Sequence, residues 1–486
     1  MSDLGENEGA VLANLWSTSR RGDKDRGKKV VDTTGPLDVR TPFEHDYDRL
    51  MFSTPVRRMA DKTQVFPLEK NDGVRTRLTH SYEVANLARS IGNRLVRTKP
   101  GIFGSPEGDL HGPTVLATVG LAHDLGNPPF GHQGENEIRR WFEAKATASD
   151  IFMPKGMDGV TTSLQQDFLK FEGNAQTLRL LSRLQVSSGG FGLDLTATTL
   201  AAVMKYTVPA AKAGKGANAS LKKPGFMMSE AEVVEWVREE TGLQEGQRHP
   251  LTWLMEACDD IAYSVLDVED AIKKSIVSAE DVLAYLHREA KKNEYIVGIA
   301  KQLTKDFEKA DAHASPTQAK EIKASYLRTR LIEALVVTAT SAFIEHQKAI
   351  FDFSHQVALL DERTPGGELY EKLKGFAKSH AYNHPSVLRT EHLGAVALSK
   401  LLDWFWEGIT DRQKVEDPLS RRRTAFGSYV YALISDNYRH EFEVRAGAKK
   451  LPLRYAEMQL LTDMISGMTD GFAMELFTDL EHLRNA

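Results

Sequence analysis

Two histidines, an aspartate and a glutamate stand close together in the stretch GLAHDLGNPPFGHQGE, residues 120–135. Imidazole and carboxylate groups are natural ligands of divalent cations such as manganese, iron, nickel, zinc or magnesium. The adjacent His123 and Asp124 cannot point the same way from the middle of a regular helix. A helix end is therefore expected here, where Gly126 and two prolines turn the backbone and let both side chains converge on one ion. The alternative is a partly buried histidine that is only paired with the aspartate.

A third histidine lies in an upstream segment with helical periodicity. In TRLTHSYEVANLARSIGNRL, Val84, Leu87 and Ile91 recur at helical spacing, and His80 falls on the same face. An unpaired polar side chain on an apolar face is costly. We therefore expect His80 to have a partner inside the protein.

A second acidic group interrupts the apolar run LMEACDDIAYSV. Asp259, Tyr263 and Asp267 lie at positions i, i+4 and i+8, so they share one face of a helix. Such a face lines solvent or, on a helix as apolar as this one, borders a polar cavity. With His80 and the His-Asp pair, Asp259 would supply two imidazoles and two carboxylates and leave positions on a metal ion for water and substrate.

The rest of the chain predicts an almost entirely helical protein. Apolar residues recur at helical spacing from Phe43 onward, period-2 strands are nearly absent, and no Gly-rich loop follows a strand. The fold class is therefore all-α, without a Rossmann or P-loop architecture. We expect a flexible basic segment over residues 1–40, a core over 41–290, and a helical C-terminal region over 291–486 that packs on the core and on other subunits.

Two segments lack the helical pattern. Residues 1–40 are rich in Lys and Arg and hold few large apolar side chains, which predicts a solvated, partly disordered lead-in. The alternative is a basic arm that touches nucleic acid or a neighbouring subunit. Residues 207–226 are rich in Ala, Gly and Lys and contain no acid, which predicts a long mobile loop with solvated lysines.

Composition places the chain among ordinary globular proteins. It has 486 residues, of which 41% are hydrophobic and 27% charged, ample for a sizeable core. Its single cysteine, Cys258, excludes an intramolecular disulfide, as expected in a reducing cytoplasm. No segment approaches the roughly 20 apolar residues that cross a bilayer. The net charge of -5 argues against a protein dominated by nucleic-acid binding. We expect a soluble cytoplasmic protein that does not bind membranes.

The order H…HD…D resembles that of the HD-domain metal-dependent phosphohydrolases. Flanking motifs, which span about residues 40–473, narrow the resemblance to the deoxyguanosine triphosphate triphosphohydrolase (dGTPase) family of dNTP hydrolases. The matching stretches are RTPFEHDYDRLMFSTPVRRMADKTQVFPL, RLTHSYEVANLARSIG, GLAHDLGNPPFGHQGE, FEGNAQTLRLL, MEACDDIAYSVLDVEDAI and LLTDMISGMTDGFA. The pairing of HDLGNPPFGHQGE with FEGNAQ is the most specific part of this pattern.

The resemblance implies a role for each matching residue. The implied metal ligands are His80, His123, Asp124 and Asp259. The implied catalytic acid–base pair is His132 and Glu135. The implied substrate contacts are Arg77, Asn174, Gln176, Lys205, Tyr206, Tyr263 and Asp267. Asp259 is preferred to Asp260 because Tyr263 and Asp267 lie four and eight residues after Asp259, on the same helical face.

The resemblance also implies a reaction, a cofactor and an assembly. The family converts a dNTP to a deoxynucleoside and inorganic triphosphate by attack at the α-phosphorus. The implied cofactor is a divalent metal ion, Mn²⁺ or Mg²⁺ foremost, with iron, cobalt, nickel or zinc as alternatives. A homo-oligomer, specifically a hexamer, is expected, with a nucleotide or single-stranded DNA as candidate effector. The consecutive aromatics at 404–406 cannot all face one core, because successive helical residues point about 100° apart. At least one must face outward or meet another surface, which is either a subunit interface or a second packed helix of the same subunit.

Two positions depart from the family pattern. Asn127 stands where some relatives carry His, which would weaken a phosphate or acid–base contact at that position. Gly471 stands where many members have Arg, which puts a subunit or effector contact in doubt.

Two other functions remain open from the residues alone. A nucleotide monophosphatase or guanosine tetraphosphate hydrolase of the HD type would release orthophosphate or pyrophosphate. A nucleic-acid-binding or dNTP-sensing protein would use the basic arm and the lysine-rich loop, although stacking aromatics are not interleaved with those lysines.

Overall fold

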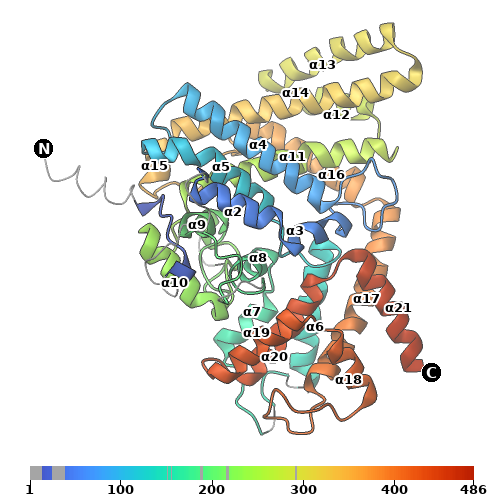
Figure 1. Ribbon diagram of the computed structural model, residues 1–486. Helices are drawn as coiled ribbons and strands as arrows, with labels where there is room; N and C mark the ends of the chain where they lie inside the picture. Colours follow the sequence, from blue (N-terminus) through green and yellow to red (C-terminus); the bar gives the residue numbers. More distant parts are fainter. Residues whose placement is uncertain are drawn as a thin grey trace, which may run out of the picture. The chain divides into compact units, whose positions relative to one another are not determined.

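The protein is described from a computed structural model, drawn in Figure 1. It describes residues 14–23, 39–149, 151–154, 156–185, 190–214, 218–290 and 293–485. Every regular element in these residues is a helix, apart from two isolated β-bridges, so the all-α prediction is confirmed. None of the described helices is both long and apolar enough to cross a membrane.

The chain divides into two compact units, each assembled from separate segments of the sequence. The first unit comprises residues 1–63, 122–249 and 391–486, and the second comprises residues 64–121 and 250–390. The boundary expected from sequence near residue 290 therefore lies inside the second unit.

The first unit surrounds one central helix, α20. Its described helices are η1 (Arg21–Asp23), α2 (Pro42–Met51), α3 (Thr54–Arg58), η2 (Met59–Asp61), α6 (Gly131–Ser149), α7 (Thr162–Leu169), α8 (Gly173–Ser182), α9 (Ala197–Val203), η3 (Ala219–Leu221), η4 (Met228–Glu230), α10 (Ala231–Thr241), most of α17 (Pro385–Thr410), α18 (Ala425–Ala432), α19 (Asp436–Ala448), α20 (Leu453–Gly467) and α21 (Asp470–Asn485). All residues from 455 to 466 are buried, including polar ones. Asp463 accepts hydrogen bonds from Arg179 at 2.8 and 2.6 Å, and Glu457 pairs with Arg412. Buried charges of this kind are tolerated because they are paired.

The second unit is organised around helix α11. Its described helices are α4 (Arg77–Thr98), α5 (Pro106–Ala122, of which the last residue falls in the first unit), α11 (Pro250–Lys273), α12 (Ala279–Glu289), α13 (Glu294–His313), α14 (Pro316–Glu345), α15 (Gln347–Phe351), α16 (Pro365–Ala377), the π-helical η5 (Lys378–Tyr382) and the start of α17. Helices α4, α14 and α16 pack against α11, and α13 runs beside α14 (Figure 1). Helix α4 begins with a capping box of Thr76 and Thr79. It buries Val84 and Ile91 as the periodicity predicts, whereas Leu87 is only half-buried.

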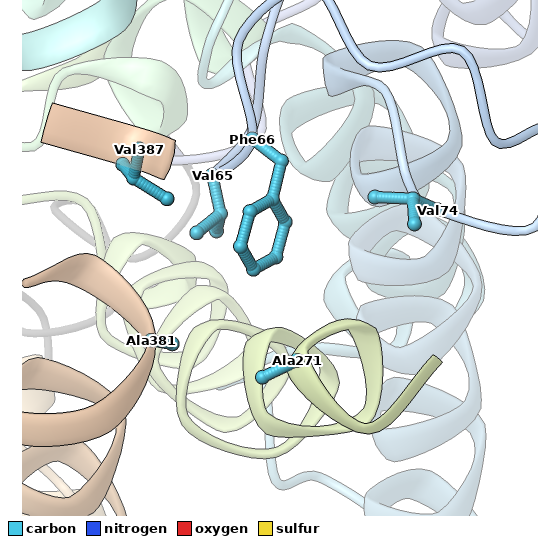
Figure 2. Packing of buried hydrophobic residues seen from close by; sticks show 6 residues of the cluster. All are labelled: Val65, Phe66, Val74, Ala271, Ala381 and Val387. Carbon is cyan, nitrogen blue, oxygen red and sulfur yellow. The ribbon is translucent and has the colours of Figure 1, made fainter. Parts of the chain in front are cut away.

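A hydrophobic cluster closes the C-terminal end of α11 (Figure 2). The cluster consists of Val65, Phe66, Val74, Ala271, Ala381 and Val387. Figure 2 shows the ring of Phe66 lying over the end of α11 near Ala271. Val65 and Phe66, which precede α4 in the sequence, thereby anchor the segment leading to α4 against the helix that carries Asp259.

The described part of the N-terminal segment is packed, so the prediction of a flexible lead-in is wrong for residues 14–23. Leu15 is completely buried, and its carbonyl oxygen lies 3.1 Å from Nε2 of His249. Local sequence patterns could not predict this contact, because His249 lies 234 residues after Leu15. Residues 1–13 and 24–38, which hold most of the predicted basic arm, are outside the described residues.

The lysine-rich stretch 207–226 is also folded where it is described. Residues 207–210 are buried, and the amide of Gly225 donates to the carbonyl of Val208 at 2.8 Å. The prediction of a mobile loop is therefore wrong for these residues, while residues 215–217 are outside the described part. The absence of acids in the stretch misled the prediction, because Lys212 and Lys223 pair with Glu245 and Glu172 outside it.

The three consecutive aromatics of α17 are covered within the chain. Trp404 stacks on Phe477 with ring centroids 5.9 Å apart, and Phe405 is completely buried. Trp406 meets Trp141 edge-to-face at 6.0 Å. These aromatics therefore give no support to a subunit interface, and the expected oligomer rests on the family resemblance alone.

Candidate active site

His80 and Asp259 form a contact inside the second unit. His80 lies in the first turn of α4 and is completely buried, and its Nε2 is 3.3 Å from Oδ1 of Asp259 on α11. The neighbouring Asp260 accepts from the hydroxyl of Tyr370 at 3.0 Å. The two adjacent carboxylates therefore point to different partners, and the one beside the histidine is Asp259.

His123 and Asp124 begin a sharp turn in the first unit. Helix α5 ends at Ala122, so the predicted helix end is confirmed. Nε2 of His123 is 3.6 Å from Oδ2 of Asp124. Oδ1 of Asp124 accepts from Nδ2 of Asn127 at 2.7 Å, so the residue that departs from the family pattern orients this carboxylate.

The turn is held so tightly against α8 that a side chain at Gly126 would not fit. A Cβ atom there would lie 2.2 Å from both the Gly173 carbonyl oxygen and the Thr177 amide nitrogen. The amide of Gly126 donates to Oγ1 of Thr177 at 2.9 Å. The glycine of the HDLG motif is therefore required by close backbone approach.

The second half of the turn places the side chain of His132 next to a buried carboxylate. Phe130 and Gly131 both have positive φ, 60° and 54°, and α6 begins directly at Gly131. Nδ1 of His132, in the first turn of α6, lies 3.2 Å from Oε2 of Glu135. The histidine side chain is 79% exposed and the glutamate side chain 3%. A hydrogen bond from Nδ1–H to Glu135 fixes the tautomer and the orientation of the ring.

Glu135 belongs to a partly buried charge network. Its Oε1 accepts from the amide of Gly173 at 2.8 Å. Arg139 lies 3.3 Å from both Glu135 and Glu172, and Nζ of Lys223 lies 3.1 Å from Oε1 of Glu172. Lys223 comes from the lysine-rich stretch and was not predicted as a site residue.

The network keeps Glu135 ionised in spite of its burial. Burial acts to raise the pKa of Glu135, but the hydrogen bond from His132 and the charges of His132 and Lys223 hold it below its usual value. The pKa of Glu172 is raised, by burial and by the negative charge of Glu135. Glu135 is thus a stable anion that can hold an imidazole in one orientation.

The predicted substrate residues of the first unit differ in their surroundings. Asn174 is half-buried and donates to Oε1 of Glu172 at 2.9 Å, which places it beside the charge network. Gln176 is completely buried and donates to Asp463 at 2.9 Å. Lys205 is half-buried, and Tyr206 is buried, with the guanidinium of Arg248 over its ring.

In the second unit, Arg77 is buried at the start of α4. Tyr263 and Asp267 both contact Tyr382, which was not predicted as a site residue. The hydroxyl of Tyr382, in η5, donates to Oδ2 of Asp267 at 2.6 Å, and its ring lies 5.7 Å from that of Tyr263. Asp267 is completely buried, and burial raises its pKa well above the usual value. The predicted shared face exists, but its distal carboxyl group is capped by Tyr382.

Comparison with known proteins defines the class. A family model described as "HD domain" matches residues 77–171. The match contains His80, His123, Asp124, His132 and Glu135. The chain is therefore a hydrolase of the HD superfamily, and HD domains imply binding of a divalent metal ion.

Full-length relatives define the family. A deoxyguanosinetriphosphate triphosphohydrolase-like protein of Listeria innocua is 34% identical over 95% of this chain and 98% of its own length. The deoxyguanosinetriphosphate triphosphohydrolase of Klebsiella pneumoniae is 33% identical over 91% of this chain and 94% of its own length. The chain belongs to the deoxyguanosinetriphosphate triphosphohydrolase family, and the resemblance stated from the motifs is confirmed.

Proposed function

We propose that this protein is a metal-dependent dNTP triphosphohydrolase that splits a dNTP into a deoxynucleoside and inorganic triphosphate. The observation that carries the proposal is the His132–Glu135 pair, in which an exposed imidazole, eight residues after Asp124, is hydrogen-bonded to a buried carboxylate. Family membership supports the substrate class.

The proposed metal ligands are His80, His123, Asp124 and Asp259. Two imidazoles and two carboxylates suit manganese or iron, and they also accept zinc, nickel or cobalt; Mn²⁺ or Mg²⁺ is our first expectation. The pairwise contact of His80 with Asp259, and the orientation of Asp124 by Asn127, support this set. When bound, such an ion supplies polarisation of an α-phosphate oxygen.

His132 is the proposed general acid. Water attacks the α-phosphorus, the bond from phosphorus to the sugar 5′-oxygen breaks, and the leaving alkoxide must receive a proton because its conjugate acid is weak. Nε2 of His132 donates that proton, while Glu135 holds the ring through Nδ1 and stabilises the charged imidazolium.

The proposed substrate contacts serve the triphosphate and the sugar. Arg77 and Lys205 balance the negative charges of the triphosphate. Tyr206, beside the lysine, is a further proposed contact. Tyr263 packs under the sugar and leaves little room for a 2′-hydroxyl. Asp267 is the proposed partner of the 3′-hydroxyl through Oδ1, which has no hydrogen-bond partner in the described residues.

Both side-chain amides of the FEGNAQ motif are proposed active-site residues. Asn174 remains a proposed active-site residue because it touches Glu172 of the charge network. Gln176 also remains a proposed substrate residue: its Nε2 donates to Asp463, and its buried Oε1 has no hydrogen-bond partner in the described residues.

The resemblance supports three further proposals. They are a homo-oligomer, specifically a hexamer; a nucleotide or single-stranded DNA effector; and, together with the single cysteine, a location in the cytoplasm. Sedimentation with and without dNTP tests the first, and a monomer under both conditions would refute it.

One product assay tests the reaction. Each dNTP and NTP is incubated with the protein and Mn²⁺ or Mg²⁺, and triphosphate, pyrophosphate and orthophosphate are resolved. Triphosphate from dNTPs is the expected product. Orthophosphate or pyrophosphate would favour another HD enzyme, and binding without turnover would favour a dNTP sensor.

A further inference from the structure

The turn between the HD dipeptide and α6 is bound at both ends by residues from distant segments of the first unit. Nζ of Lys62 donates to the carbonyl oxygen of Asn127 at 2.6 Å and to that of Ser466 at 2.7 Å. At the other end, the amide of Phe130 donates to Oδ1 of Asp470 at 3.0 Å. Lys62 and Asp470 are 4% and 2% exposed, so water competes little for these contacts.

The end held by Asp470 is the strained part of the turn. Phe130 has a φ of 60°, a left-handed conformation that a bulky side chain adopts only when its surroundings impose it. The phenyl ring is seated against Gly394, where a Cβ atom would lie 2.6 Å from the ring. The ring seat and the amide contact with Asp470 together hold the backbone in this conformation.

Asp470 is itself fixed on its other side by Thr63. Its Oδ2 accepts from the amide of Thr63 at 3.0 Å and from the hydroxyl of the same residue. Asp470 is also the first residue of α21. The first residues of the C-terminal helix and the segment that follows η2 are therefore joined to the turn through a single carboxylate.

Each end of the turn leads directly to a residue of the proposed reaction. Asn127, whose carbonyl binds Lys62, orients Asp124 through its side-chain amide at 2.7 Å. Phe130, whose amide binds Asp470, precedes His132 by two residues. A displacement of the backbone at either end would therefore move the side chain of Asp124 or of His132.

We propose that Lys62 and Asp470 are positioning residues that clamp the turn and so set the relative placement of Asp124 and His132. This inference rests on the proposed function for its kinetic consequence. Neither residue is a proposed substrate contact. Both act through the backbone of the turn, and misplacement of a catalytic group by about 1 Å costs roughly 100-fold in rate.

The test compares Asp470→Ala with two matched variants of the full-length protein. Asp470→Ala removes the acceptor of the Phe130 amide. Thr63→Val removes one of the two donors that hold Asp470 and keeps the amide donor, and Asp479→Asn, the control, changes an exposed acid of the same helix. We expect Asp470→Ala to lower kcat for a dNTP by about 10- to 100-fold with little change in KM. Thr63→Val should cause a smaller loss, and Asp479→Asn should stay within about threefold.

Hydrogen exchange of the peptide covering residues 126–136 gives a second readout. Exchange should accelerate in Asp470→Ala and remain unchanged in Asp479→Asn. If Asp470→Ala does not fold, Lys62→Met serves instead, because it frees the Asn127 end of the turn and leaves Asp470 in place.

The outcomes separate this inference from the proposed function. An active wild type whose Asp470→Ala and Lys62→Met variants keep full kcat and normal exchange would overturn the clamp. Equal losses in Asp479→Asn and Asp470→Ala would also overturn it, because they would indicate a general effect of changing α21. A wild type that hydrolyses no dNTP refutes the proposed function, and the exchange experiment then still decides whether the clamp exists.

Discussion

Nδ1 of His132 lies 3.2 Å from Oε2 of Glu135, and the two side chains have opposite environments: the imidazole is 79% exposed and the carboxylate 3%. A buried anion can orient an exposed ring without blocking its other nitrogen. This arrangement is the structural basis for assigning proton donation to His132.

His132→Ala should lower turnover by a factor of roughly 10² to 10⁴, the usual contribution of a general acid. Metal content and substrate affinity should be retained, because the ring lies outside the proposed ligand set. Single-turnover kinetics and equilibrium binding of a dNTP make the measurement. A collapse of binding with normal turnover of bound substrate would assign His132 to binding instead.

Lys223→Met should lower kcat by about tenfold, because it removes the cation that offsets the adjacent negative charges of Glu172 and Glu135. Lys222→Met is the matched control, since that side chain is exposed on the same segment. Steady-state kinetics of both variants decides the point. Equal activities of the two variants would show that Lys223 does not contribute to turnover.

Tyr263→Ala should erode the preference for deoxy- over ribonucleotides, because the ring no longer limits the space for a 2′-hydroxyl. Tyr370→Phe is the control, since it changes a tyrosine that contacts Asp260. The ratio of kcat/KM for dGTP and GTP reports the effect. Equal ratios in the wild type and Tyr263→Ala would remove the sugar-selecting role.

The burial of Asp167, which is not a proposed site residue, predicts that the free energy of unfolding depends on pH. It is buried, accepts from the hydroxyl of Tyr455 at 2.7 Å and from the amide of Met228 at 2.8 Å, and burial raises its pKa to about 7. Between an unfolded-state pKa of about 4 and this value, the folded protein binds a proton that the unfolded chain does not. This group's contribution to stability is therefore fully present below about pH 4 and falls until about pH 7.

Asp167→Asn should remove that slope, because the amide resembles the neutral acid and does not titrate. The midpoint of thermal unfolding, measured from pH 5 to pH 8, should fall less steeply with pH in the variant than in the wild type. Parallel curves would contradict the raised pKa.

The local sequence is sufficient for features that depend on spacing alone. The apolar period of α4 identifies His80 as a buried residue, and the glycine and prolines after Asp124 predict the helix end at Ala122. Spacing also places Tyr263 and Asp267 on one face of α11. The motifs themselves are distinctive enough to indicate the family, because several of them recur in one order along nearly the whole chain.

Contacts between distant segments cannot be predicted in the same way. Tyr382 lies 115 residues after Asp267, and Lys223 lies 51 residues after Glu172 in a stretch whose composition indicates a solvated loop. Leu15 falls in a segment predicted to be flexible because its partner, His249, lies 234 residues away. Periodicity shows which side of an element is apolar, but not which residues cover its polar groups.

The most direct test of the proposed reaction is hydrolysis of dGTP in ¹⁸O-labelled water with Mn²⁺, followed by mass spectrometry of both products. Attack at the α-phosphorus predicts one labelled oxygen in inorganic triphosphate and none in deoxyguanosine. His123→Ala and Asp124→Ala, two variants of the proposed metal ligands, should remain folded and give neither product. Label in the nucleoside, release of labelled orthophosphate or pyrophosphate, or full activity of the metal-stripped variants would contradict the account.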